Sequence, residues 1–466
     1  MRLSPLALCV LSCLSAPAWA GTPSDHQRIE QLEAQVKALT AELEAMKAQP
    51  AEPAVAASPA PVASNPTQGA EAEADALAAD ASDVAAVAPD AGSDQNALAA
   101  VAAPAGDTGG SGANAFNPAI SIILNGSYSH HSLDPSAYAR TGFPLVGEGA
   151  PSPNGFSLGE SEVSFAANID DKFYGQLTAT VESEDGEDHL GIEEAYIDST
   201  ALPDGLSLRL GRFYSSIGYL NSHHAHTDNF FDRPLPYQAF LGNQYGDDGV
   251  QLRWVAPTSL FFEVGGEAFR GQNYPSGGAQ HGGLGTRTLF AHLGGDAGND
   301  NEWLVGVSAL KTQTAGGEDG FSGDDTLAIF DGTWKWAPQG NFKDGGITLR
   351  GEYMVDDRDG SYIDPNDPSF AALWNGSRRG AYLEGVYRFN RTWDVGYRYD
   401  KLWGDADLPF ASFDPSRHSA ELTWRNSEFS LFRLQLSHDK PNPDDDDNAV
   451  TVQYQTSLGA HGAHKF

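Results

Sequence analysis

The chain has 466 residues and carries 63 acidic residues against 28 lysines and arginines, so its formal net charge at pH 7 is −35. A chain this acidic repels nucleic acid and other polyanions and attracts cations, although part of the excess also keeps its surface hydrated. We therefore expect no nucleic-acid partner. Both cysteines, Cys9 and Cys13, fall within the first 20 residues, and the cysteine-free remainder suits an oxidising envelope compartment.

Residues 1–20 have the pattern of a secretory signal peptide. Arg2 precedes an apolar run from Leu3 to Leu14, and Ala18-Trp19-Ala20 places small residues at the cleavage positions. The alternative, a lipoprotein modified at Cys13, is weaker because the residue two positions before this cysteine is larger than usual. No later apolar run is long enough to form a membrane-spanning helix.

Residues 21–49 are predicted to form a short coiled coil. Apolar residues recur there at alternating spacings of three and four: Ile29, Leu32, Val36, Leu39, Leu43 and Met46. The following stretch offers this seam nothing to pack on, so we expect self-association, with a homotrimer as the predicted state. A single amphipathic helix would have the same pattern. We place this segment in the periplasm, where peptidoglycan is a further expected partner.

Residues 50–115 are predicted to be a disordered linker. This stretch consists mainly of Ala, Pro, Gly, Ser and acidic residues, and it contains no Lys or Arg. It cannot bury enough apolar surface to fold, and its charges repel one another.

From residue 116 to residue 466 the apolar residues follow a period of two. The pattern is clearest in two predicted hairpins, which turn at Asp170-Asp171 and at Asn390-Arg391. Apolar positions of these hairpins are Val163, Phe165, Ile169, Phe173, Leu177, Val181, Leu383, Tyr387, Phe389, Trp393, Val395, Tyr397 and Tyr399. One face of such strands suits lipid and the other suits water.

We predict about sixteen strands in this region. They begin near residues 118, 157, 172, 190, 205, 247, 258, 285, 301, 324, 344, 379, 392, 416, 428 and 449. The connections alternate between tight turns and longer loops rich in glycine and acidic residues, as in outer-membrane barrels with short periplasmic turns and long external loops. The predicted fold is therefore an all-β, transmembrane antiparallel barrel, preceded by the coiled coil and the linker.

The last residues support a location in the bacterial outer membrane. An alternating stretch, Val450 to Leu458, leads to a terminal aromatic residue, Phe466. A terminal aromatic behind a strand is typical of outer-membrane barrels, so lipid and lipopolysaccharide are the expected surroundings. A water-soluble β-sandwich fits the alternation alone, but it fits neither the predicted signal peptide nor the asymmetry of the loops.

The segment from Gly191 to Gly242 resembles the phosphate-selective porin superfamily. Its sequence is GIEEAYIDSTALPDGLSLRLGRFYSSIGYLNSHHAHTDNFFDRPLPYQAFLG. The stretches ISIILNGSYS and NGFSLGESEVSFAANIDDKFYG, together with the histidine-bearing loop, resemble a group of porin-like proteins linked to zinc uptake. Members of that group are often labelled zinc-regulated TonB-dependent outer membrane receptors. The resemblance implies a trimeric outer-membrane channel.

Two features of the sequence depart from these labels. The predicted loops are acidic, whereas phosphate selectivity in the superfamily depends on basic pore walls. A TonB-dependent receptor needs a plug domain and about 22 strands, which the barrel region of residues 116–466 cannot supply. We therefore expect the architecture of a porin.

A candidate metal site lies in the loop predicted between residues 214 and 246. Three imidazoles and a carboxylate occur there within six positions, at His223, His224, His226 and Asp228. Neutral imidazole and carboxylate are the ligands that Zn²⁺ prefers. In an extended loop, all of these except His223 would point to the same side.

This loop is the third external connection of the predicted barrel, which commonly folds into the lumen of sixteen-stranded porins. His130 or His189, expected in neighbouring external loops, would complete the site. The alternative is a hydrated loop whose histidines pack under Phe230 and Phe231.

The sequence thus favours passive, cation-biased uptake of small solutes, with zinc as a ligand or transported ion and no required cofactor. No catalytic motif occurs, so we do not expect an enzyme. Three alternatives stay open: a structural or adhesin-like outer-membrane anchor, an outer-membrane enzyme such as a lipase, and a TonB-dependent metal receptor.

Overall fold

The computed structural model describes residues 118–184, 187–277, 283–342, 344–365, 367–405 and 412–459. The predicted signal peptide, coiled coil and linker, as well as the terminal Phe466, lie outside the described residues. Among the residues described, no helix is long and apolar enough to cross a membrane.

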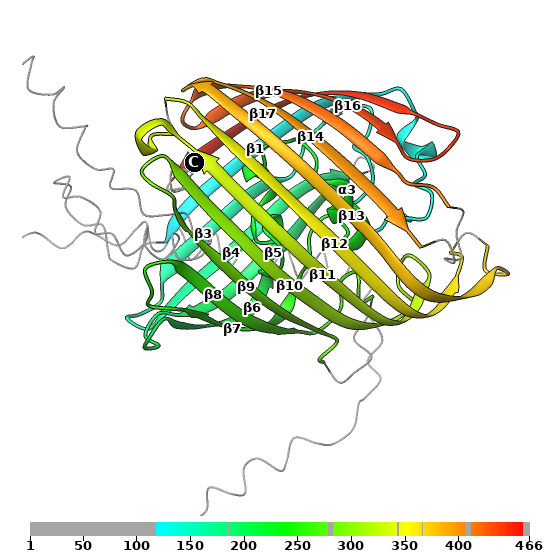
Figure 1. The fold of residues 1–466 in the computed structure, drawn as a ribbon, viewed down its shortest axis with the longest axis horizontal. Helices are drawn as coiled ribbons and strands as arrows, with labels where there is room; N and C mark the ends of the chain where they lie inside the picture. Colours follow the sequence, from blue (N-terminus) through cyan, green and yellow to red (C-terminus); the bar gives the residue numbers. More distant parts are fainter. Residues whose placement is uncertain are drawn as a thin grey trace, which may run out of the picture. The chain divides into compact units, whose positions relative to one another are not determined.

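The strands among the described residues form one closed antiparallel β-sheet (Figure 1). The ring closes where β1 (Ala119–His131) pairs with β17 (Asp447–Gly459). Two short segments, β2 (Gly155–Ser157) and β3 (Ser161–Asn168), both pair with β1 and share one position in the wall. The seventeen segments therefore make a barrel of sixteen strands, which confirms the predicted fold class and strand number.

The other elements continue in chain order around the ring. The strands are β4 (Phe173–Glu184), β5 (Glu187–Ser199), β6 (Leu206–Tyr214), β7 (Gly246–Val255), β8 (Phe261–Phe269), β9 (Thr286–Asp296), β10 (Asn301–Ala315), β11 (Phe321–Trp336), β12 (Gly346–Ile363), β13 (Ala371–Asn390), β14 (Trp393–Gly404), β15 (Ser416–Ser427) and β16 (Ser430–Lys440). The helical segments are η2 (Pro135–Ala137), η3 (Leu220–Ser222), η4 (Ala225–Thr227), α3 (Leu235–Phe240) and η5 (Pro338–Gly340).

Two strands differ from the sequence prediction. β13 begins at Ala371 rather than near residue 379, because its first residues pair with the end of β12 although their apolar alternation is irregular. The second predicted strand is divided at Leu158–Glu160. Gly159 packs there against β1, because a Cβ at this position would lie 2.7 Å from the side-chain nitrogen Nδ2 of Asn125.

The turns that the sequence predicted at Asp170-Asp171 and at Asn390-Arg391 lie at the same end of the barrel. Asp170 and Asn390 close their turns in the same way, because each side-chain oxygen accepts hydrogen bonds from the backbone N–H groups two and three residues later. This capping is the usual reason for Asp or Asn at such positions.

The side chains of the wall are arranged inside out relative to a water-soluble protein. Glu384 and Arg398 point inward and are buried, whereas Leu383, Val395 and Tyr397 point outward and are exposed. Period two therefore separates a polar interior from an apolar exterior.

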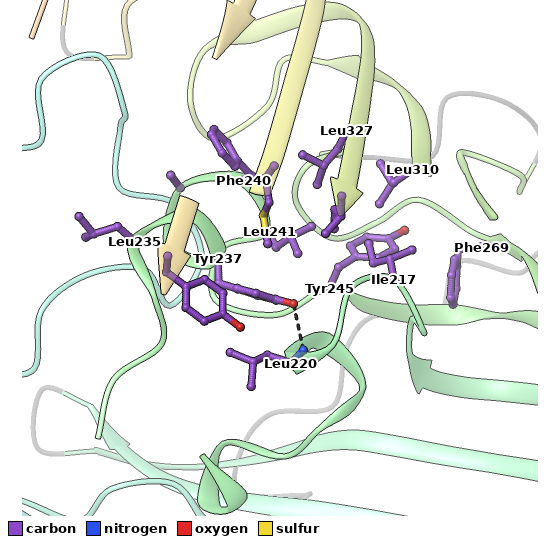
Figure 2. Packing of buried hydrophobic residues seen from close by; sticks show 14 of the residues in the cluster. Ile217, Leu220, Leu235, Tyr237, Phe240, Leu241, Tyr245, Phe269, Leu310 and Leu327 are labelled. Atoms are coloured by element: carbon purple, nitrogen blue, oxygen red, sulfur yellow. Dashed lines mark hydrogen bonds between the residues drawn. The ribbon is translucent and has the colours of Figure 1, made fainter. Parts of the chain in front are cut away.

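The connection between β6 and β7, residues 215–245, folds into the interior of the barrel. Its helix α3 packs against β13 and β14, and Leu235 and Tyr237 in it are fully buried. The loop shares an apolar cluster with the wall, in which Leu310 and Leu327 face it from β10 and β11 (Figure 2). This cluster explains why the loop stays inside the barrel.

Candidate metal centre

The inward loop places two of the predicted histidines side by side. His224 and His226 flank the start of the turn η4, in which the backbone N–H of Thr227 donates to the carbonyl oxygen of His224 at 2.9 Å. Because the chain turns here, the two imidazole rings stack with their centroids 5.6 Å apart. The rings face the wall formed by β3 and β5.

Three glutamates of the wall meet these imidazoles. Nδ1 of His226 lies 2.6 Å from the carboxylate of Glu162. Nδ1 of His224 lies 3.3 Å from both Glu162 and Glu193, and its Nε2 lies 3.0 Å from Glu194. His224 therefore bridges β3 and β5, whereas His226 contacts β3.

Two neighbouring residues of β5 reach the interior because the strand contains a bulge. Thr178 of β4 pairs with Glu194, but the next residue of β4 pairs with Ile192, so Glu193 has no cross-strand partner. A bulge of this kind re-aims side chains and is common beside functional sites. It explains how Glu193 and Glu194 both contact His224 although successive strand residues normally point to opposite faces.

The centre is nearly shielded from water. The side chains of Glu162 and His226 are each 3% exposed, and that of His224 is 19% exposed. Burial alone would lower the pKa of His224, but the surrounding carboxylates, Glu162 foremost, outweigh it and raise the pKa well above the ordinary value. In the absence of a cation, these carboxylates therefore favour a protonated imidazole.

The geometry around His224 is that of ligands converging on a common point. Its Nδ1 has two carboxylate oxygens at 3.3 Å, yet neither contact meets the geometry of a hydrogen bond. One ligand atom from each of Glu162, His224 and His226 lies within 4.8 Å of the others. In a tetrahedral zinc site such atoms are about 3.4 Å apart, close to the 3.3 Å between Nδ1 of His224 and Glu162, whereas the 2.6 Å contact of His226 with Glu162 would lengthen.

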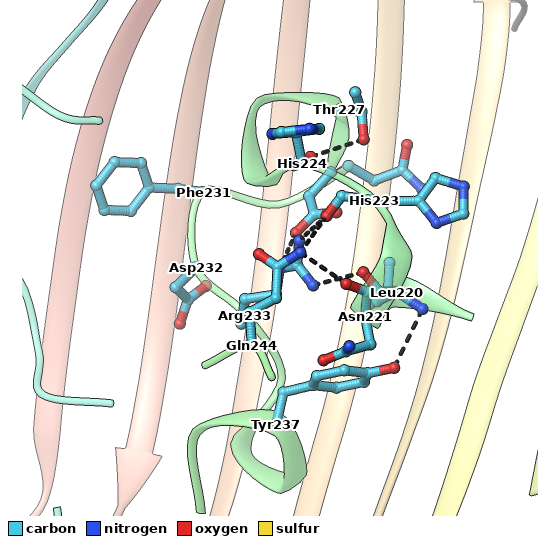
Figure 3. A network of polar contacts seen from close by, with 12 residues as sticks. Leu220, Asn221, His223, His224, Thr227, Phe231, Asp232, Arg233, Tyr237 and Gln244 are labelled. Atoms are coloured by element: carbon cyan, nitrogen blue, oxygen red, sulfur yellow. Dashed lines mark hydrogen bonds and ion pairs between the residues drawn. The ribbon is translucent and has the colours of Figure 1, made fainter. Parts of the chain in front are cut away.

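Two residues of the predicted site lie elsewhere in the loop. Nδ1 of His223 lies 2.7 Å from the carbonyl oxygen of Tyr219, on whose ring the imidazole also stacks. Asp228 pairs with Arg233 at 2.6 Å. Figure 3 shows Arg233 beneath this part of the loop, where its guanidinium donates to the carbonyl oxygens of Leu220 and His223.

The neighbouring histidines named as completing residues do not join the centre described here. His130 lies on β1 and His189 on β5, and both are exposed. The wall glutamates take that role. Only the adjacent pair Glu193-Glu194, within an otherwise alternating strand, could have indicated it from the sequence.

The loop carrying the histidines is also held by the neighbouring strands β14, β15 and β16. The Asp232 carboxylate accepts hydrogen bonds from Arg398 at 3.0 Å, from Gln435 at 2.7 Å, and from Arg417. Burial alone would raise the pKa of Asp232, but the Arg398 and Arg417 guanidiniums outweigh it and lower the pKa to about 2. Asp232 is therefore a charged anchor for the loop.

A second anchor lies on β12. The carboxylate of Glu352 accepts hydrogen bonds from the backbone N–H groups of Tyr219 and Leu220 at 3.3 and 3.2 Å. It also accepts one from the hydroxyl of Tyr237 at 2.9 Å. Both ends of the histidine segment are thus fixed to the barrel wall.

Comparison with known proteins gives similarities of a general kind. No protein-family model matches the sequence. A protein of Aquifex aeolicus (strain VF5), described as uncharacterized, is 29% identical over 394 residues, which cover 76% of this chain and 80% of that protein.

Similar solved structures include outer-membrane proteins. An anion-selective porin from Comamonas acidovorans has a TM-score of 0.49 at 10% identity and covers 73% of this chain and 99% of its own. The trimer form of OmpT from Vibrio cholerae has a TM-score of 0.48 at 11% identity, with 74% and 100% covered. For the channel DcaP of Acinetobacter baumannii the TM-score is 0.47 at 11% identity, with 73% and 97% covered. The class of this chain, a closed sixteen-stranded antiparallel barrel, rests on its own strand pairing.

Proposed function

We propose that this chain is a porin-like channel of the bacterial outer membrane, through which small solutes pass by diffusion, with a bias towards cations. The observation that carries the proposal is the inside-out barrel, in which an inward loop places imidazoles beside three glutamates of the wall. An apolar exterior matches membrane hydrocarbon, and a polar interior favours water and hydrated solutes.

The exterior carries a feature typical of the membrane interface. Near the tight turns, aromatic rings on four successive strands contact one another: Trp393, Trp424, Phe432 and Tyr454. Aromatic residues are enriched where lipid headgroups meet hydrocarbon. This row supports insertion with the tight turns at one membrane surface and lipopolysaccharide around the opposite end.

The bias towards cations is inferred from how the interior charges are paired. Several acidic side chains elsewhere in the interior have guanidinium partners, as in the pairs of Asp198 with Arg209 and of Asp394 with Arg388. Among the described residues, the glutamates around His224 have ion-pair contacts with imidazoles only. Such a centre attracts cations more strongly than a matched ion pair does.

We further propose zinc, or a similar divalent cation, as a ligand or transported ion bound by Glu162, His224 and His226. Two imidazoles and one carboxylate match the ligand set that zinc takes in sites with an open position. Conduction needs a site from which the ion can leave, so we expect modest affinity. We assign no catalytic role and no resident cofactor, and we keep the homotrimer, assembled through residues 21–49, as part of the proposal.

A structural anchor is the second candidate. The apolar contacts of α3 with the wall fix part of the loop inside the barrel, as a permanent plug would require. Contact of residues 21–49 with peptidoglycan would serve the same role.

Recordings from the full-length protein in planar lipid bilayers distinguish the two candidates. A channel should give stepwise conductance in KCl, and a KCl gradient should give a reversal potential of the sign for preferred K⁺ passage. Glu162→Gln and Glu193→Gln should reduce this selectivity, whereas Glu428→Gln, in an exposed turn, should not. The absence of conductance would favour the anchor, and anion selectivity would contradict the proposed bias.

A further inference from the structure

A second group of possible ligands adjoins the first and shares one residue with it. Carboxylate oxygens of Glu160, Glu162 and Glu193 lie within 4.8 Å of one another. Glu162 therefore belongs both to this oxygen-only triad and to the triad that it forms with His224 and His226.

Two local irregularities and one small side chain bring these carboxylates together. The interruption between β2 and β3 leaves Glu160 just outside β3, two positions before Glu162 and on the same side of the chain. The bulge in β5 turns Glu193 inward. On the intervening strand β4, the residue opposite Glu162 is Thr180, whose short side chain leaves room for acids from both neighbouring strands.

Among the described side chains, the oxygen-only triad has no guanidinium or ammonium group beside it. Throughout the described part of the chain, no Lys or Arg forms an ion pair with Glu160, Glu162 or Glu193. Carboxylates this close repel one another unless a cation or a shared proton lies between them.

A separate observation points to a cation. Glu193 is nine-tenths buried, and its Oε2 lacks a hydrogen-bond partner while lying 3.3 Å from Nδ1 of His224, which also lacks one. Leaving both atoms unsatisfied in a buried position is costly, whereas two metal–ligand bonds would satisfy them.

We propose that the centre binds two divalent cations, bridged by Glu162. This inference rests on the proposed metal-binding function and deepens it. The imidazole side, with His224 and His226, suits a borderline metal such as Zn²⁺. The side made by Glu160 and Glu193 offers only oxygen, which suits harder cations such as Mn²⁺, Mg²⁺ or Ca²⁺. A shared carboxylate holds two such ions about 3.5–4 Å apart.

The pair of sites gives a channel a way to bind cations without retaining them. Two ions so close repel each other, so arrival of one at the carboxylate side weakens the hold of the imidazole side on the other. Adjacent weak sites that destabilise each other's ion are a general requirement for conduction.

Substitutions of the ligands separate the two sites. Glu160→Gln removes a ligand from the carboxylate side alone, and His224→Ala with His226→Ala removes the imidazole side alone. Glu162→Gln removes the bridge and should weaken both sites. Glu428→Gln, which neutralises a carboxylate in an exposed turn, is the control for charge.

The test uses the folded full-length protein in detergent micelles, with Mn²⁺ as the probe for electron paramagnetic resonance and Zn²⁺ for equilibrium dialysis. We expect two Mn²⁺ per chain with an exchange-coupled spectrum in the wild type. The Glu160→Gln variant should bind one Mn²⁺ per chain and give the six-line spectrum of an isolated ion. Heat-modifiable migration on gels confirms that each variant is folded.

The outcomes separate failure of this inference from failure of the proposed function. One bound ion in the wild type, lost in the double histidine variant but unaffected by Glu160→Gln, would overturn the two-ion inference and leave the zinc site intact. Absence of binding of either metal by the folded wild type would overturn both.

Discussion

Replacement of Asp232 by Asn should loosen the attachment of the inward loop to the barrel wall. The pKa of this carboxyl is lowered from 3.8 to about 2, because Arg398 and Arg417 stabilise its charged form. A tenfold change in an acid dissociation constant corresponds to about 1.4 kcal/mol, so the charge contributes about 2 kcal/mol to the attached state. Loss of that contribution should raise the population of the locally detached loop by about 30-fold.

Hydrogen exchange measured by mass spectrometry can detect this change. The backbone N–H of Phe231 donates to Gln435 at 2.8 Å, and Gln435 also donates to Asp232, so this amide reports on the same network. In Asp232→Asn it should exchange about 30-fold faster at neutral pH. The control is Asp344→Asn, since the ion pair of Asp344 with Arg391 is largely exposed and should contribute little.

The same charge predicts a pH dependence. Because the pKa of Asp232 is depressed in the folded protein, its stabilising effect is complete above the ordinary value of 3.8 and is lost as the pH falls from there through about 2. The wild-type loop should therefore loosen only in this acid range, and the Asn variant should lack this step. Unchanged exchange in Asp232→Asn at neutral pH would refute the anchoring role.

Three further outcomes are expected. Replacing Leu32 and Leu39 with Asp should convert a trimer into monomers, because the substitutions place charges in the predicted a/d seam of the coiled coil. The mass of the protein in detergent measures the oligomeric state. An unchanged trimer would show that contacts between barrel walls assemble the trimer. Gly306→Ala should lower the free energy of unfolding in urea by about 1–3 kcal/mol, because the added Cβ would clash with the carboxylate of Asp331. Gly126→Ala is the control, since a Cβ there has nothing within 4 Å and should lower the free energy of unfolding less. Equal effects of the two substitutions would contradict the packing argument. Calorimetry should show that the affinity for zinc falls by about 100-fold from pH 7.5 to pH 5.5. The pKa of His224 is raised in the metal-free protein, so its imidazole must lose a proton before a metal binds. An affinity that does not depend on pH would exclude imidazole ligands.

The sequence was sufficient to predict the barrel because period two extends through most strands. Pairs such as Leu383 with Glu384 assign one face to the exterior and one to the interior, and the turn residues mark the ends. The prediction was less accurate where alternation is irregular, as in the first residues of β13 and between β2 and β3. There, pairing with the neighbouring strand, rather than local pattern, determines the structure.

The candidate site was predicted only in part, for two physical reasons. The turn at Ala225–Thr227 replaces the extended backbone that would have aligned Asp228 with the histidines, and Arg233 provides that carboxylate with a nearer partner. The actual neighbours of the imidazoles come from strands far away in the chain. Of these, Glu193 reaches the site through a bulge that alternation cannot reveal.

We propose that the channel carries a divalent-cation site where its inward loop meets the wall. Single-channel current in KCl, recorded while Zn²⁺ is added, tests this claim most directly. We predict that Zn²⁺ reduces the wild-type current reversibly, and that His224→Ala with His226→Ala abolishes the effect. The control variant carries His418→Ala and His438→Ala, two histidines that are exposed on the outer face of the barrel. Zn²⁺ should reduce its current as it does in the wild type. Equal responses of the wild type and the His224/His226 variant, or no response in either, would contradict the claim.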